Sequence, residues 1–206
     1  MKKKILNKAI NMIKKNKKLD SNQEEIILYG LESIYLTLSK IIIVLLLAII
    51  LEILKEVLIL LLCYNVFRLV GFGLHATKSS YCLISSIVMF IGGAFICKYL
   101  YIPNTIQIIL AIFSMIIFYF YAPADTKKRP IINMKKRKIY KTLTVLFSLL
   151  FTIAIITLKD NPITIYMMLG MILESIMIHP LTYKIFNLPY DNYKEYLKKY
   201  PESIKV

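Results

Sequence analysis

Residues 67–82 read FRLVGFGLHATKSSYC and separate two strongly apolar runs of the chain. Gly71 and Gly73 loosen the backbone within this stretch. The Thr-Lys-Ser-Ser segment at 77–80 is rich in residues that favour caps and turns over helix interiors. The stretch therefore predicts that one helix ends here and that a new helix begins just before Cys82.

The apolar runs on either side of this stretch decide the fold class. The 206 residues are 58% hydrophobic with a mean hydropathy of +0.63, whereas soluble domains are roughly half apolar. A helix needs about 20 mostly apolar residues to cross the hydrocarbon. The sequence predicts an all-α, polytopic membrane protein with about six membrane-embedded helices, at about 34–51, 57–70, 81–100, 105–121, 142–158 and 163–180. The second helix contains Arg68 and is expected to be short or re-entrant.

The net charge of +15 is concentrated in two segments. The first 18 residues carry eight lysines, and residues 127–141 carry eight further cations. Nucleic acid is one partner for such charge, but short loops rich in Lys and Arg characteristically stay in the cytoplasm. With the N-terminus inside and six crossings, every strongly basic segment lies inside, and the nearly neutral connections lie outside at 52–56, 101–104 and 159–162. We therefore expect a multi-pass protein with both termini cytoplasmic and no nucleic-acid partner.

The N-terminal segment 1–20 has its own pattern. Apolar residues from Ile5 to Ile13 gather on one helical side, and lysines cover the rest. This pattern is typical of an amphipathic helix lying in the interface of an anionic bilayer. We expect residues 1–206 to form a single membrane-embedded domain, with a basic cytoplasmic loop at 122–141 and a polar cytoplasmic tail at 182–206.

His75 and Cys82 are the candidate catalytic residues. An imidazole and a thiol are the minimum set for thiol nucleophilic catalysis, although such a pair also occurs by chance. On an unbroken helix their seven-residue spacing would separate them by about 10.5 Å along the axis. A catalytic pair therefore requires the predicted helix break. If Ser79 caps the new helix, Cys82 lies in its first turn, where the helix dipole and Lys78 favour the thiolate. Lys78 equally fits a positive-inside residue at a helix end.

Glu174 is an acidic residue within the last apolar run. An ionisable residue at such a position is a functional candidate by default. It is expected to pair with Arg68 or to orient His75, and a purely structural ion pair is the alternative. The three cysteines show neither a disulfide framework nor metal-type spacing, so no metal or cofactor is expected.

Two motifs resemble those of a known family. Arg68, Gly73, His75, Ala76 and Cys82 resemble the signature R…G-x-H-A…C of the accessory gene regulator B (AgrB) family. The segment YAPADTKKRPI at 121–131 is similar to the second signature of that family, an Ala-Pro followed by a basic run and a Pro. Chain length, span count and the basic N-terminus also agree, so the resemblance covers essentially the whole chain. One departure is Phe72, which precedes Gly73 where many members have a second glycine.

The resemblance implies a function and a set of site residues. AgrB proteins are bacterial membrane cysteine endopeptidases that cleave the AgrD precursor of a quorum-sensing peptide and assist its cyclisation to a thiolactone or lactone. By this resemblance Cys82 is the nucleophile and His75 its base. Further positions that the family uses for activity are Arg68, Gly73, Lys127, Lys128 and Arg129. The implied partner is an AgrD-like precursor whose acidic C-terminal tail the basic loop could hold, although that loop is also a positive-inside signal.

Two other functions remain open from the sequence. One is a peptide transporter or exporter without proteolysis, and the other is a non-catalytic membrane adaptor with a basic cytoplasmic face. Few polar residues lie within the apolar runs to form a transport pathway, and no P-loop is present. A homodimer is one oligomeric state open to a polytopic protein of this size.

Overall fold

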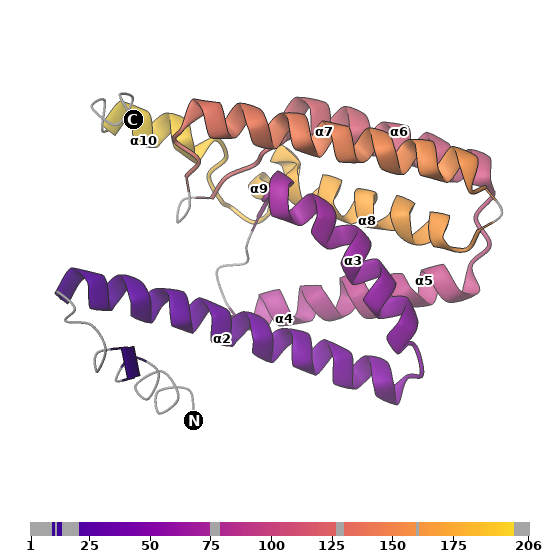
Figure 1. Cartoon of the computed structure of the whole chain (residues 1–206), viewed down its shortest axis with the longest axis horizontal. Helices are drawn as coiled ribbons and strands as arrows, with labels where there is room; N and C mark the ends of the chain where they lie inside the picture. The colour runs from indigo at the N-terminus through magenta and orange to yellow at the C-terminus, as the bar shows by residue number, and fades with distance from the viewer. Residues whose placement is uncertain are drawn as a thin grey trace. The chain divides into compact units, whose positions relative to one another are not determined.

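The computed structural model describes residues 10, 12–13, 21–74, 79–126, 130–159 and 161–199. Over these residues every regular element is helical, which confirms the all-α prediction for them. Figure 1 labels the elements, which are α2 (Ser21–Ile50), α3 (Leu54–Gly71), α4 (Ser79–Ile87), the π-helical turn η1 (Val88–Gly92), α5 (Gly93–Tyr99), α6 (Asn104–Tyr121), α7 (Met134–Thr157), α8 (Ile163–Ile178), α9 (Pro180–Ile185) and α10 (Asn192–Lys199). The chain divides into two compact units, Met1–Leu51 and Glu52–Val206.

The long helix of the first unit is α2. It has 30 residues and begins well before the apolar run predicted at 34–51, because the helical spacing of the preceding residues continues into that run. Among the residues of α2 whose side chains the structure describes, Thr37–Ile50 form an apolar stretch. The predicted interfacial helix at 1–20 lies outside the described residues, apart from positions 10, 12 and 13.

The second unit is a bundle in which α3 packs against α7 and α8, and α6 packs against α7 and α8 (Figure 1). Phe67 of α3 stacks on Phe118 of α6 with 5.0 Å between ring centroids, and its ring lies edge-on to Phe151 of α7 at 4.9 Å. Helices α3 and α8 approach closely because Gly170 has no side chain. A Cβ at Gly170 would lie 3.0 Å from the backbone nitrogen of Tyr64.

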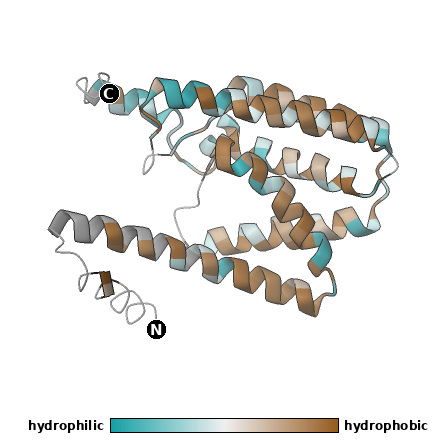
Figure 2. Cartoon of the chain, viewed as in Figure 1, coloured by the Kyte–Doolittle hydropathy of each residue, from teal (hydrophilic) through white to brown (hydrophobic). Residues whose placement is uncertain are grey.

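Three helices within the described part of the chain are long and apolar enough to cross a membrane. They are Ser80–Tyr99, Asn104–Tyr121 and Met134–Thr157, and they match the third, fourth and fifth predicted spans. The first of these runs without interruption through α4, η1 and α5. Helix α8 is apolar but shorter, and α3 carries three charged residues, Lys55, Glu56 and Arg68. In Figure 2 the apolar colour runs along α6 and most of α7.

The two ends of the second unit differ in polarity. At one end lie the connections from α5 to α6 and from α7 to α8, and Lys98 Nζ donates to the Glu52 carbonyl oxygen at 3.0 Å (Figure 1). At the other end the segments after α3, α6 and α8 meet, as their hydrogen bonds show below. The hydrophilic start of α7 lies at this second end, beside α10 (Figure 2). This arrangement matches the predicted alternation of nearly neutral and basic connections.

One predicted loop boundary is wrong. The loop expected at 122–141 ends at residue 133, because the Asn133 side chain caps α7 by accepting from Lys136 N at 3.0 Å. Lysine and arginine also favour helices, so the second half of the basic segment lies on α7. Within the segment predicted as a polar tail at 182–206, Tyr183 and Asn192 are buried.

Candidate active site

The described residues on either side of positions 75–78 agree with the predicted helix break. Helix α3 ends at Gly71, and the next two residues have positive φ angles, 63° at Phe72 and 84° at Gly73. Helix α4 begins at Ser79, so Cys82 lies in its first turn. His75 and Lys78 lie outside the described residues.

The backbone that leads into His75 is held from two sides. Gly73 N donates to the Ala124 carbonyl at 2.8 Å, and Ala124 N donates to the Gly71 carbonyl at 2.9 Å, forming a short parallel bridge. On the other side, Leu74 N donates to the Met177 carbonyl at the end of α8 at 3.0 Å. The segment Gly71–Leu74 is therefore fixed between the loop after α6 and the end of α8.

Arg68 and Glu174 form a buried ion pair beneath this segment. Arg68 Nη1 lies 3.5 Å from Glu174 Oε2, and the side chain of Glu174 is fully buried. The same guanidinium donates from Nη2 to the Leu74 carbonyl at 2.7 Å. Among the described residues, neither carboxylate oxygen of Glu174 makes a hydrogen bond. The pairing predicted between these two residues is present, and Arg68 also holds the carbonyl of the residue before His75.

Position 73 needs glycine because its surroundings leave no room for a Cβ atom. A Cβ at this position would lie 2.6 Å from Arg68 Nη1 and 3.0 Å from the Met177 carbonyl oxygen. The φ of 84° is itself a conformation that residues with side chains rarely adopt. Phe72 has a similar φ without being glycine, and its ring packs edge-on against Tyr140 of α7 at 4.9 Å. Both residues thus turn the chain away from α3.

Cys82 is half-buried on α4, and its surroundings connect it to α3. The Oγ atoms of Ser85 and Ser86 donate to the Cys82 carbonyl, at 3.0 and 2.8 Å. Tyr64 is a buried residue of α3. The Tyr64 ring also packs edge-on against Phe90, 5.3 Å away, on the helix that carries Cys82. The helical run that carries Cys82 therefore packs against α3 through η1 and α5.

The other two cysteines differ from Cys82 in burial. Cys63 and Cys97 are both free and buried, whereas Cys82 is partly exposed. Burial of this kind is typical of cysteines that act as small hydrophobic residues. Within the described residues no group of three or more His, Cys, Asp and Glu side chains could hold a metal ion.

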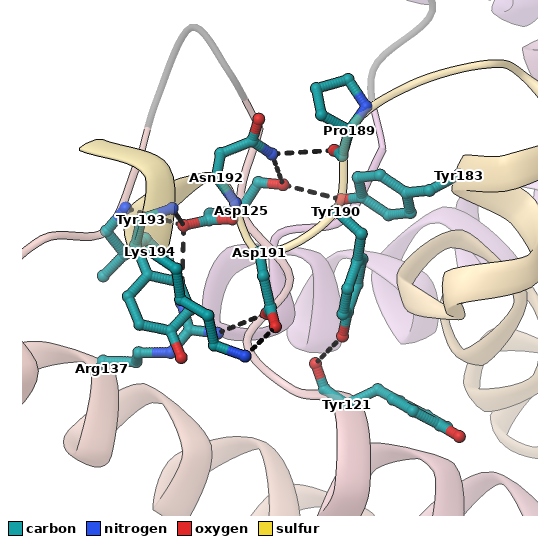
Figure 3. Close-up of polar contacts among 11 residues, drawn as sticks. Tyr121, Asp125, Arg137, Tyr183, Pro189, Tyr190, Asp191, Asn192, Tyr193 and Lys194 are labelled. Carbon is teal, nitrogen blue, oxygen red and sulfur yellow. Dashed lines mark hydrogen bonds and ion pairs between the residues drawn. The ribbon is translucent and has the colours of Figure 1, made fainter. Parts of the chain in front are cut away.

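Asp125 is the centre of a polar network that was not predicted from the sequence (Figure 3). Its carboxylate accepts from three backbone nitrogens: Ile131 N at 3.3 Å, Asn192 N at 3.0 Å and Tyr193 N at 3.0 Å. Its own carbonyl accepts from the Tyr183 hydroxyl at 3.0 Å and from Asn192 Nδ2 at 3.3 Å. Asp125 is only 2% exposed, so it joins the loop after α6 to the C-terminal segment inside the protein.

Arg137 of α7 completes this network. Its Nη1 lies 3.6 Å from Asp125 Oδ2, its Nη2 lies 3.8 Å from Asp191 Oδ1, and its guanidinium lies 3.7 Å from the centroid of the Tyr193 ring. Burial raises the pKa of Tyr183 well above its usual range, so its hydroxyl remains a donor at neutral pH. The network therefore joins α7, the loop after α6 and the segment 183–193.

Two further polar features are the second histidine, His179, and the basic run at 127–129. His179 is the N-cap of α9, where its Nδ1 accepts from Leu181 N at 3.2 Å, and its ring packs against Tyr121. Lys127, Lys128 and Arg129 lie outside the described residues. On either side of them, Asp125 and Ile131 are joined by the hydrogen bond given above.

The described residues thus define an all-helical chain with three helices of membrane-spanning length, a buried Arg68–Glu174 ion pair and a cysteine in the first turn of α4. A family model described as "Accessory gene regulator B" matches residues 6–178. The chain belongs to the accessory gene regulator B family.

Individual relatives agree with this assignment. An AgrB-like protein of Clostridium acetobutylicum is 32% identical over 174 residues, covering 84% of this chain and 83% of its own. An AgrB-like protein of Listeria innocua is 34% identical, covering 82% of each chain. The accessory gene regulator protein B of Staphylococcus aureus is 31% identical, covering 83% of this chain and 90% of its own. No solved structure matches the chain.

Proposed function

We propose that this chain is a membrane cysteine endopeptidase that processes an AgrD-type quorum-sensing precursor. Membership of the accessory gene regulator B family supports the proposal. The observation that carries it is the helix break, which starts a new helix three residues before Cys82 and ends α3 four residues before His75. This break removes the geometric obstacle to contact between the imidazole and the thiol.

Cys82 is the proposed nucleophile and His75 its base. The thiolate sulfur attacks a carbonyl carbon of the precursor, a C–S bond forms, and the peptide C–N bond breaks. His75 takes the thiol proton and passes it to the leaving amine, so the C-terminal part of the precursor departs. The N-terminal part remains as a thioester on Cys82. A thiol or hydroxyl of the precursor then attacks this thioester, closes the ring and regenerates the Cys82 thiol.

Ring closure competes with hydrolysis at the same carbonyl. The internal nucleophile wins when it is held close to the thioester, where its effective molarity is very high. Exclusion of water from a membrane-embedded site favours the same outcome. The half-buried position of Cys82 at the start of an apolar helical run supports the second condition.

Arg68, Gly73 and Glu174 are proposed to position His75 rather than to contact the precursor. Arg68 holds the Leu74 carbonyl, Glu174 compensates the charge of Arg68, and Gly73 leaves room for the guanidinium. Lys78 is proposed to favour the Cys82 thiolate from the start of α4. Lys127, Lys128 and Arg129 are proposed to bind the acidic C-terminal tail of the precursor through charge complementarity.

We place the protein in the bacterial cell membrane as a single domain with six membrane-embedded helices, an interfacial N-terminal helix and cytoplasmic termini. The separation of nearly neutral and basic connections to opposite ends of the second unit supports this topology (Figure 1). His75, Cys82 and the basic loop would then face the cytoplasm, where a newly made precursor arrives. A homodimer in the bilayer is compatible with this proposal.

Co-expression with an AgrD-type precursor tests the function. Cys82→Ala and His75→Ala should each abolish cleavage, whereas Cys97→Ala, which alters a buried thiol on the same helical run, should leave it intact. A Cys82→Ala protein that still cuts the precursor would exclude the proposed mechanism. Export of an uncut precursor would identify a transporter instead.

A further inference from the structure

The most extensive polar network among the described residues surrounds Asp125, a residue without a role in the proposed mechanism. Five hydrogen bonds from the protein reach its carboxylate and carbonyl oxygens. The guanidinium of Arg137 compensates its charge. Buried carboxylates are costly unless paired and hydrogen-bonded, so such complete satisfaction indicates a position that the fold specifies closely.

The Asp125 network adjoins the backbone segment Gly71–Leu74 that leads into His75. Ala124, the residue before Asp125, exchanges two hydrogen bonds with Gly71 and Gly73. Movement of Asp125 would therefore move Ala124 and weaken this bridge. Leu74, in the same segment, accepts a hydrogen bond from Arg68 at its carbonyl and donates one from its backbone nitrogen to the Met177 carbonyl.

The C-terminal segment holds Asp125 in place from outside the membrane helices. Asn192 and Tyr193, at the start of α10, donate their backbone N–H groups to the carboxylate, and the Tyr183 hydroxyl donates to the carbonyl (Figure 3). These contacts link residues 58 to 68 positions apart in the sequence. The C-terminal segment is thus connected through Asp125 and Ala124 to the turn before His75.

We propose that Asp125 is a positioning residue for the cysteine endopeptidase reaction, acting through Ala124 on the Gly71–Leu74 turn that carries His75. The inference rests on the proposed function, because it assigns His75 as the base. The carboxylate is needed because three backbone donors and a guanidinium face it. An amide at this position would direct its own N–H₂ toward at least one of those donors.

The test compares Asp125→Asn with Asp191→Asn in the full chain. Asp191 is the matched control, because it pairs with the same Arg137 but is more exposed than Asp125 and, among the described residues, has no hydrogen bond or ion pair to the Ala124 loop. Both variants are reconstituted in lipid vesicles with an AgrD-type precursor peptide. We expect Asp125→Asn to lower kcat by about tenfold or more with KM within about twofold, since misplacing a catalytic group costs rate rather than binding. Asp191→Asn should stay within about twofold of the parent in both constants.

A second readout does not depend on the precursor. The rate at which iodoacetamide alkylates Cys82 is measured against pH in a Cys63→Ala/Cys97→Ala background, with His75→Ala as the reference for a lost base. Asp125→Asn should move the alkylation profile toward that of His75→Ala. If the parent protein does not cut the precursor, the proposed function fails, and this alkylation profile still decides the positioning role.

Several results would overturn the inference. One is a folded Asp125→Asn protein with the parent kcat and alkylation profile. Others are a raised KM at unchanged kcat, or an equal loss in Asp191→Asn.

If Asp125→Asn does not accumulate in membranes, Tyr183→Phe replaces it, because it removes only the hydroxyl that donates to the Asp125 carbonyl. Tyr183→Phe should lower kcat by about threefold at constant KM, and an unchanged kcat would count against the role equally.

Discussion

Arg68 Nη1 lies 3.5 Å from Glu174 Oε2, and this pair sits directly beneath the turn that leads to His75. The guanidinium serves two partners at once, since its Nη2 donates to the Leu74 carbonyl. Glu174 lies on α8, so the ion pair joins α3 and α8 at the same place where Gly73 crosses between them. The Gly71–Leu74 turn and the packing of α3 against α8 therefore share the same two charges.

Removing one charge of this pair should destabilise the protein, and removing both should not. Glu174→Leu leaves a buried guanidinium unpaired, which is expected to cost about 3–5 kcal/mol of unfolding free energy. The double variant Arg68→Met/Glu174→Leu should recover most of this stability, because apolar side chains replace both charges. Thermal unfolding in detergent micelles measures the effect.

Activity separates the two roles of the pair. Both variants should fail to cut the precursor, because the double variant still lacks the guanidinium that holds Leu74. A Glu174→Leu protein as stable as the parent, or an active double variant, would contradict the positioning role given to Arg68.

Gly73→Ala should impair both folding and cleavage. Its Cβ would meet Arg68 Nη1 at 2.6 Å, and the φ of 84° would remain strained. We expect a loss of about 1–3 kcal/mol of stability and at least a tenfold lower rate of cleavage, roughly the effect of a small displacement of a catalytic group. The matched control is Gly92→Ala, whose Cβ has no neighbour within 4 Å on a helical backbone. A Gly73→Ala protein that matches Gly92→Ala in unfolding temperature and cleavage rate would show that the turn tolerates a side chain at position 73.

Tyr183→Phe should weaken the C-terminal network without introducing a pH dependence between pH 6 and 9. The lost hydroxyl bond is expected to cost about 1 kcal/mol. Burial raises the pKa of Tyr183, so its contribution is fully present below the ordinary tyrosine pKa and is lost only as pH rises toward the higher folded-state value. Unfolding of parent and variant measured in parallel over this pH range checks the difference. A difference that shrinks between pH 6 and 9 would mean that the hydroxyl already titrates there.

Neutralising the basic run should weaken binding of an acidic precursor tail. The triple variant Lys127→Gln/Lys128→Gln/Arg129→Gln is expected to bind the precursor about tenfold more weakly at low salt, with less difference at high salt. The charge-matched control replaces the exposed Lys135, Lys136 and Lys138 on α7. Fluorescence anisotropy of a labelled precursor measures binding, and a protease-protection assay checks that neither triple variant inverts in the membrane. Equal losses in the two triples would indicate a general charge effect instead of a site.

The sequence predicted the site better where the signal was local. Paired glycines and a Thr-Lys-Ser-Ser segment indicated the end of α3 and the start of α4, because these residues act through their own backbone. The Arg68–Glu174 pair was one of two partnerships expected for Glu174, since a charge within an apolar helix needs a partner. Three of the six predicted spans correspond to helices of membrane-spanning length within the described residues.

The role of Asp125 could not be predicted in the same way. An acidic residue next to a basic run is typical of a surface residue that balances the charge of nearby lysines. Its partners Tyr183, Asn192 and Tyr193 lie in a polar tail whose composition gives no sign of burial. Only the fold brings these segments together, because each bond closes a loop of about 60 residues or more, and no local pattern records it.

The most direct test of the account is to trap the thioester on Cys82. A Cys63→Ala/Cys97→Ala protein, in which Cys82 is the only thiol, is mixed with the precursor, quenched in acid and analysed by intact mass spectrometry. The account predicts an adduct with the mass of the N-terminal precursor fragment, which neutral hydroxylamine removes and which Cys82→Ala never forms. Cleavage of the precursor by Cys82→Ala, or an adduct that resists hydroxylamine, would contradict it.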